Sequence, residues 1–399
     1  MSKQKIYPLL ALATLSAGSL QAYEVPLTFL GTNMPPLDFH GFASQGYLAS
    51  SDYNYLANNT RDGSFKFSEA GLNMAVNPFP RTRIAIQAFT YDVGDAGKYD
   101  VVLDYASAEY TFNDYFGVRA GRIRRPEGIY NDIQDVDVAR TYVLLPQGMY
   151  NARWRDFFVS VDGGEVFGTI PMGKAGSLGY QLYYGLQRPQ LDGGLAIQKE
   201  NLPPYQKLDY FNSPQLGGGQ LWWNTPLEGF RVGAALNYDN DLTFRTVGSP
   251  GVQAEGSPFT QHYSLEYDWR KWTFQAEYYN SAVDYDITAD GHHITTAKIH
   301  PDSWYIGAAY RFNKWFETGV YYSEYYADLT HRGGIQPTPS DGFQKDAALS
   351  FRFDPTSWWT LKVEGHCIHG TAQLSDNVDN PVRDDNIWFM LALKSTFSF

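Results

Sequence analysis

Apolar and polar side chains alternate along much of this chain with a period of two residues, and this limits the fold more than any other feature. In the stretch 359–367, odd positions carry Trp, Leu, Val, Gly and Cys, and even positions carry Thr, Lys, Glu and His. Successive side chains of a β-strand point to opposite faces, so this pattern predicts a strand with one dry and one wet face. Five successive segments between 304 and 399 follow the same rule.

The same pattern predicts about 16 strands along the chain. An even number is typical of single-chain bacterial outer-membrane barrels. The fourth, fifth and eighth strands alternate poorly, which leaves the count open by two. The predicted strands are 38–50, 63–76, 82–92, 100–112, 116–124, 155–170, 177–187, 217–224, 230–240, 261–269, 272–281, 303–312, 315–326, 345–353, 358–370 and 387–399.

The connections between these strands are of two kinds. Short turns, such as 113–115 and 313–314, are rich in Asn, Pro and Gly and have aromatic residues beside them. The long, mostly polar connections are 126–154, 188–215, 241–260, 282–302, 327–344 and 371–386. Periplasmic turns, extracellular loops and aromatic girdles are typical of a transmembrane antiparallel β-barrel, which is the all-β fold that we predict.

The wet faces separate this fold from a secreted β-sandwich, whose strands also alternate. A filled core could not hold unpaired charges, whereas barrels of 16 to 18 strands leave an aqueous channel. The wet faces carry Arg231, Glu266, Glu277, Glu317, Arg352, Lys362 and Lys394. We therefore predict a channel with a charged, water-filled wall.

The N-terminus has the composition of a secretory signal. Two lysines precede an uncharged run, and residues 20–22 end on a small residue suited to cleavage. We expect a signal peptide over 1–22 and one barrel domain over 23–399, with 23–36 as an N-terminal extension. Beyond residue 22 no apolar stretch approaches the ~20 residues of a membrane helix. A net charge of −12 excludes a nucleic-acid partner, which needs a basic face.

Several short motifs resemble those of Gram-negative outer-membrane porins, in particular a porin-like family of gammaproteobacteria. They are His40–Phe42, Gln45–Leu48, Gly121–Ile123, Pro126, Gly128–Asn131, Asp135–Asp137, Arg140–Thr141, Leu145–Gln147 and Arg155–Asp156. The terminal Phe399 resembles the signal that the barrel-insertion machinery reads. The resemblance implies a homotrimer in the outer membrane. Gln134 departs from the basic residue that many members carry nearby, so the family's charge selectivity does not transfer.

The stretch around 126–154 is the candidate pore constriction, because the third extracellular loop of porins folds into the barrel. Its middle, 141–150, is largely apolar, which favours packing against a wall. Arginine suits a fixed field at a constriction. The candidate residues are Arg83, Arg119, Arg122, Arg124, Arg125, Glu127, Asp132, Asp135, Asp137 and Arg140. Three interpretations stay open: loop carboxylates that face wall arginines and orient dipolar solutes, an arginine path for anions, or ion pairs that only hold the loop. Because Arg122 and Arg124 share the parity of dry-face residues, either a bulge intervenes or the strand has left the bilayer.

The function that we predict is passive diffusion of ions and small hydrophilic solutes, with no cofactor, metal site or enzymatic reaction. No G-x-S-x-G, H-E-x-x-H or phosphate-binding glycine loop occurs in the sequence. A plugged structural or adhesive barrel and an enzymatic barrel are the alternatives. The expected partners are outer-membrane lipid, the permeating solutes, the insertion machinery and two further copies of the chain.

Overall fold

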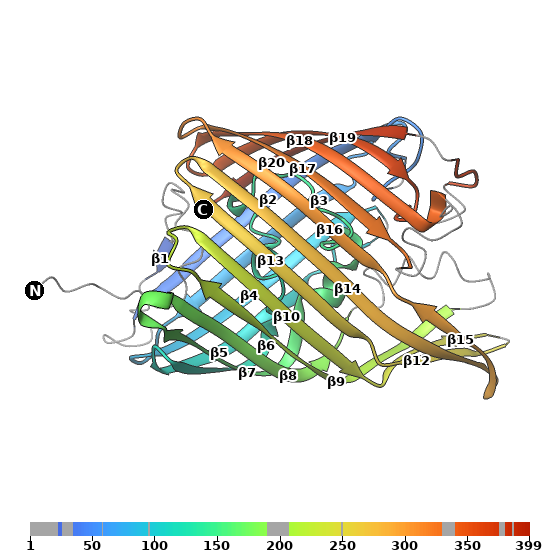
Figure 1. Cartoon of the computed structure of the whole chain (residues 1–399), viewed down its shortest axis with the longest axis horizontal. Coiled ribbons are helices and arrows are strands. Elements are labelled where there is room, and N and C mark those ends of the chain that lie inside the picture. The colour runs from blue at the N-terminus through green and yellow to red at the C-terminus, as the bar shows by residue number, and fades with distance from the viewer. Residues whose placement is uncertain are drawn as a thin grey trace, which may run out of the picture.

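The computed structural model is a closed barrel of 16 antiparallel strands, as the alternation predicts (Figure 1). It describes residues 23–25, 35–57, 59–94, 96–189, 207–248, 250–328, 340–374, 380–384 and 387–399. The barrel strands are β2 (Leu37–Ser50), β3 (Phe67–Val76), β4 (Thr82–Val93), β5 (Val102–Asn113), β6 (Phe116–Arg124), β7 (Ser160–Pro171), β8 (Ser177–Gln187), β9 (Lys207–Asn224), β10 (Phe230–Asn240), β13 (Phe259–Trp269), β14 (Trp272–Ala289), β16 (Asp302–Arg311), β17 (Phe316–Tyr326), β18 (Phe343–Thr356), β19 (Trp359–Gly370) and β20 (Ile387–Ser398).

Each barrel strand pairs with the next one along the chain, and β20 pairs with β2 to close the ring. The main chains of Gly41 and Phe399 exchange two hydrogen bonds at the end of this seam. Directly beyond it, the short strand β1 (Tyr23–Val25) pairs with Leu37–Phe39 of β2 and extends the wall. The predicted signal peptide, 1–22, lies outside the described residues, as do 26–34 of the extension.

Side chains alternate between the two faces of the wall, as β20 shows. Ile387, Phe389 and Leu391 are exposed on the outer face, whereas Lys394 and Thr396 are buried inside. An outer apolar face suits lipid, and an inner polar face suits a lumen. Among the described residues, no helix has both the length and the apolar composition needed to span a membrane.

Several predictions about strands and connections are wrong in part. The stretch 188–215, expected as a loop before a strand over 217–224, contains the first half of β9, which begins at Lys207. The expected strand 155–170 begins only at Ser160, because Arg155–Phe158 form the short helix α1, whose Phe157 ring packs on Phe211 and Phe244. The stretches 241–260 and 282–302, expected as loops, contain β11 (Leu242–Val247), β12 (Val252–Gly256) and β15 (His292–Ile299).

These extra strands form because β9 and β14 are longer than the other barrel strands. Their ends extend past the rim and offer free hydrogen-bonding edges, so β11 pairs with β9, while β12 and β15 pair with β14. The labelled strands β12 and β15 project at the lower right of Figure 1. Alternation was too weak there to reveal strands, since β15 is largely exposed on both faces.

A dry cluster fills part of the lumen toward the end with the long connections. Wall residues such as Phe89 and Trp388 pack there against Tyr55 and Leu56, which lie between β2 and β3, and against Val143 and Leu144. The open part of the lumen therefore lies toward the end with the short turns.

Candidate functional site

A long connection between β6 and β7 folds into the barrel, and we call residues 125–159 the inserted loop. It contains three short 3-10 turns, Asn131–Ile133, Asp137–Ala139 and Ala152–Trp154, followed by α1. It contains the stretch 126–154 that the sequence singles out. Its apolar segment is buried: Tyr142, Val143, Leu144 and Leu145 are each at most 2% exposed.

Asp137 anchors the loop to the strands beside the seam. Its carboxylate lies 2.9 Å from Nζ of Lys362 and 3.6 Å from Nζ of Lys394, and it accepts a 2.8 Å hydrogen bond from Thr396. Burial alone would raise the pKa of Asp137, but the two ammonium groups hold it well below its usual range. Arg140 adds a longer ion pair at 3.5 Å. Asp137 is thus a structural ion-pair partner.

Asp135 is held in the same way near the start of the loop. Arg124 donates from Nη2 to both of its carboxylate oxygens, at 2.8 and 2.9 Å, and also pairs with Asp104 on β5. Gln87 donates a further hydrogen bond. Arg155 joins Asp104 at 2.9 Å and lies 3.8 Å from Asp135. Burial disfavours the charge on Asp135, but the arginines lower its pKa.

Glu127 pairs with its neighbour Arg125, and both are buried. Burial opposes ionisation of this carboxylate, but the guanidinium and the nearby imidazole of His262 lower the pKa of Glu127 to about 2. Three of the candidate carboxylates in the loop, Glu127, Asp135 and Asp137, therefore form ion pairs with neighbouring cations.

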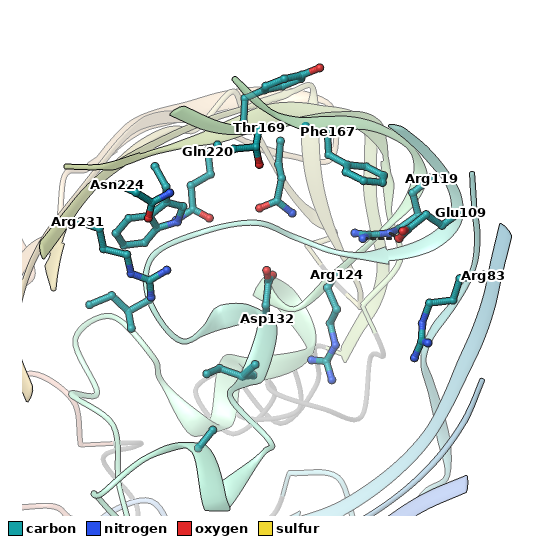
Figure 2. Close-up of a pocket in the computed structure, with 18 of the residues that line it drawn as sticks. Arg83, Glu109, Arg119, Arg124, Asp132, Phe167, Thr169, Gln220, Asn224 and Arg231 are labelled. Carbon is teal, nitrogen blue, oxygen red and sulfur yellow. Dashed lines mark hydrogen bonds and ion pairs between the residues drawn. The ribbon is translucent and has the colours of Figure 1, made fainter. Parts of the chain in front are cut away.

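A cavity of about 1480 Å³ lies between the inserted loop and the short-turn end of the barrel (Figure 2). The turns around 77–81 and 113–115 line its mouth together with Pro35 of the N-terminal extension. The residues Gly128–Tyr130, Asp132 and Ile133 of the loop line its inner end. We call this cavity the vestibule.

Asp132 is the remaining candidate carboxylate of the loop, and it faces the vestibule. Figure 2 shows it pointing into the space between Arg124 and Arg231. Among the described residues it has no ion-pair partner, and its Oδ1 has no hydrogen bond. Burial and the Glu165 carboxylate raise the pKa of Asp132 to about 6, although Arg119 and Arg124 oppose this shift. A free, titratable charge therefore lies at the inner end of the vestibule.

Arginines from the wall surround this end. Arg119 donates to Glu109 and Glu165, at 2.8 and 2.9 Å, so much of its charge is compensated. Arg83 on β4 lines the vestibule and has no ion-pair partner within the described part of the chain. Arg124 uses Nη2 for its ion pairs, while Nε and Nη1 have no described hydrogen-bond partner.

The opposite wall carries polar side chains that are also paired. Arg231 lies 2.7 Å from Glu266, and its guanidinium covers the ring of Trp222 at 4.3 Å. Gln220 donates to the carbonyl of Gly128 in the loop. The wall is thus wet and charged, but few of its charges are free.

The sequence-derived candidates fall into two groups, with Arg122 apart from both. Five line the vestibule: Arg83, Arg119, Arg124, Asp132 and Arg140. Four lie elsewhere in or beside the inserted loop as structural partners: Arg125, Glu127, Asp135 and Asp137. Arg122 is in neither group.

Arg122 faces away from the lumen. In the unbroken pairing of β6 with β7, Arg119 is opposite Glu165 and Arg122 is opposite Asp162, three residues along, so the two pairs lie on opposite faces. Arg122 bonds Asp162 at 3.0 Å on the outer face. Arg124 keeps the outward parity but turns inward where the strand ends. The pairing of β6 with β7 therefore shows no bulge at Arg122, and the alternative, that the strand has left the bilayer, stays a prediction.

Other residues that shape the site were not among the sequence candidates. Glu109, Glu165, Glu277 and Glu364 pair with the arginines or hold the loop, and His262 and His366 lie beside two of them. Their wet-face positions follow from the alternation. Only the path of the loop reveals which of them it touches.

Comparison with known proteins supports the fold. No protein-family model matches the sequence, and no curated protein is significantly similar to it. Salmonella typhi OmpF in complex with daunomycin is 12% identical, with a TM-score of 0.57 over 91% of this chain and 98% of that chain. OmpT of Vibrio cholerae is 12% identical, with a TM-score of 0.56 over 93% and 99%. An anion-selective porin from Comamonas acidovorans is 11% identical, with a TM-score of 0.52 over 91% and 99%.

At this identity the likeness shows the fold alone. The chain has the barrel of outer-membrane porins, whereas membership of the gammaproteobacterial family stays a prediction.

Proposed function

We propose that this chain is an outer-membrane porin through which ions and small hydrophilic solutes diffuse passively. The observation that carries the proposal is a charged loop folded across the lumen of a 16-stranded barrel, above a wet vestibule. Barrels of 16 to 18 strands are wide enough for an aqueous channel. The short turns then face the periplasm, and the long connections face the cell exterior.

The inserted loop forms the constriction in this proposal, and Asp132 facing Arg83 and Arg124 supplies its field. Opposite charges on the two sides of an opening orient a dipolar solute as it passes. Support comes from Asp132 and Arg83, which have no described ion-pair partner, whereas the other loop carboxylates are neutralised.

An anion-selective path is the second candidate. The vestibule is lined by eight arginines, at 81, 83, 119, 124, 140, 231, 311 and 352, and by six acidic residues, at 109, 114, 132, 266, 268 and 317. Six of these arginines are engaged in ion pairs, which reduces the excess. We rank this candidate below the mixed constriction for that reason.

The proposal includes export through a cleaved signal peptide, insertion into lipid, and assembly as a homotrimer. One similar structure, OmpT of Vibrio cholerae, is described as a trimer form. The proposal includes no enzymatic reaction.

Recording in a planar bilayer under a potassium chloride gradient tests the function. We expect discrete conductance steps, and the sign of the reversal potential decides between the two candidates. A cation-preferring potential supports the mixed constriction with ionised Asp132, and a strongly anion-preferring one supports the arginine path. A folded barrel that gives no steps would contradict the porin function and favour a plugged, structural barrel.

A further inference from the structure

Two wall glutamates hold main-chain N–H groups of the inserted loop. In the first clamp, Glu277 on β14 accepts a hydrogen bond from the N–H of Ile129 at 2.8 Å. It also accepts one from the hydroxyl of Tyr150 at 2.6 Å, and Ser264 and Tyr305 donate to the same carboxylate. A buried carboxylate with this many donors fixes the loop backbone in place.

The second clamp lies on β19, four strands along the wall from β14. Glu364 accepts the N–H of Val143 with one oxygen and the N–H of Leu144 with the other, both at 2.8 Å. Glu364 and the two loop residues are all at most 2% exposed. The two clamps therefore hold the loop at separate places, one at Ile129 and Tyr150 and the other at Val143 and Leu144.

A buried histidine from the wall accompanies each glutamate. Nε2 of His262, on β13, lies 3.0 Å from Oε1 of Glu277, and its Nδ1 lies 3.9 Å from the loop residue Glu127. Nε2 of His366 lies 3.1 Å from Oε1 of Glu364, and its Nδ1 lies 3.0 Å from Asp346. The repetition at two separate places on the wall links the imidazoles to the holding of the loop.

We propose that His262 and His366 are positioning residues that set where the inserted loop crosses the lumen, each by holding a clamp glutamate in place. This inference rests on the proposed porin function. A buried carboxylate that loses its partner takes up water or a new donor, and the main-chain groups that it held are released. The loop then shifts while the barrel wall keeps its own hydrogen bonds.

The two clamps control different properties of the channel. Ile129 is three residues from Asp132, so the His262 clamp places the free carboxylate and acts on ion preference. Val143 and Leu144 belong to the dry cluster and do not line the vestibule. The His366 clamp therefore acts on the width of the opening and leaves the charge near Asp132 in place.

The test compares His262→Gln and His366→Gln, with His293→Gln on the exposed strand β15 as the matched control. Each purified barrel is recorded in a planar bilayer with potassium chloride. We expect His262→Gln to change the permeability ratio by about threefold or more. We expect His366→Gln to raise conductance by about 1.5-fold or more, with the permeability ratio unchanged. The control matches the wild type in both properties.

A purely structural role for the histidines predicts a different result. It would lower the yield of folded barrel, measured by heat-modifiable mobility in gels, without separating ion preference from conductance. If a histidine variant does not fold, Tyr150→Phe weakens the first clamp from the loop side, and Asp346→Asn weakens the second from behind His366. The same split of effects is expected from these variants.

Rescue provides the last comparison. The double variant Glu277→Gln/His262→Gln replaces the glutamate of the first clamp together with its histidine. It removes the carboxylate charge that His262→Gln leaves without a partner, and the amide oxygen at position 277 can still accept the N–H of Ile129. We expect the permeability ratio to return toward that of the wild type. Folded single variants with the conductance and permeability ratio of the wild type would overturn the positioning role. A double variant whose permeability ratio is no closer to the wild-type value than that of His262→Gln would also overturn it. A wild-type barrel without conductance would instead overturn the porin function.

Discussion

Replacing Asp132 by Asn is the most direct perturbation of the proposed constriction. The change removes one charge and keeps the size of the side chain. Because Asp132 has no ion-pair partner in the described structure, its charge acts on passing ions instead of being compensated by a neighbour. We expect the channel to shift toward anions.

The size of the shift follows from the distance at which an ion passes the carboxylate. Two unit charges 4 Å apart interact by about 1 kcal/mol in bulk water, and by more where water is partly excluded. About 1 kcal/mol changes the local concentration of a cation roughly fivefold and that of an anion roughly fivefold in the opposite direction. The ratio of cation to anion permeability should therefore fall by roughly tenfold or more in dilute salt.

Reversal potentials at about 0.1 M and 1 M potassium chloride measure this ratio, because the screening length falls from ~10 Å to ~3 Å between them. Asp114→Asn is the matched control, since Asp114 lines the same vestibule at the short-turn end, away from the inserted loop. The control should change the ratio much less. An unchanged ratio in Asp132→Asn at low salt would refute the assignment of Asp132 to the constriction.

Three further predictions concern the same loop. Because the pKa of Asp132 is raised to about 6, this group is neutral below that pH and charged above it. The preference of the wild-type channel for cations should therefore fall as the pH falls from 7 to 5. If ion preference depended on pH as little in the wild type as in Asp132→Asn, this prediction would be wrong. Asp137→Asn leaves Lys362 buried without its counter-charge, so we expect the binding of the loop to the wall to weaken by about 3–5 kcal/mol. The loop of the folded variant should then be cleaved faster by a protease. A loop as resistant to proteolysis as that of the wild type would contradict this prediction. Gly128 has a φ of 65° and lies where a Cβ would come within 2.5 Å of the ring of His262. Gly128→Ala should therefore change the conductance of the channel without unfolding the barrel. A folded variant with the conductance of the wild type would contradict this prediction.

The alternation of apolar and polar residues predicted the barrel because one face of each strand contacts lipid and the other faces the aqueous lumen. On β19, Lys362 and Glu364 face inward and Val363 faces outward, as the sequence indicates. This rule acts on neighbours in sequence and needs no knowledge of distant contacts. The apolar middle of the inserted loop was readable for the same reason, since Val143 and Leu144 had to be covered by something.

The pairing of charges could not be read in this way. Asp137 and Lys362 are 225 positions apart, and their contact depends on the path of the loop across the lumen. Arg122 and Arg124 have the same parity, but only Arg124 enters the lumen, because the wall ends there and the chain turns into the loop. Alternation predicts which face of the wall a side chain lies on as long as the strand continues. Beyond the end of the strand it does not predict where a side chain points.

The same distinction explains why the net charge of the chain is a poor guide to its ion preference. The formal charge of −12 includes carboxylates such as Asp135 and Asp137, whose fields are cancelled by arginine or lysine within 3 Å. Such pairs place the loop but present little field to a passing ion. Under the proposed function, a single unpaired carboxylate such as Asp132 should therefore outweigh the larger acidic excess elsewhere, and the clamps that place Asp132 should influence selectivity although they never touch the solute.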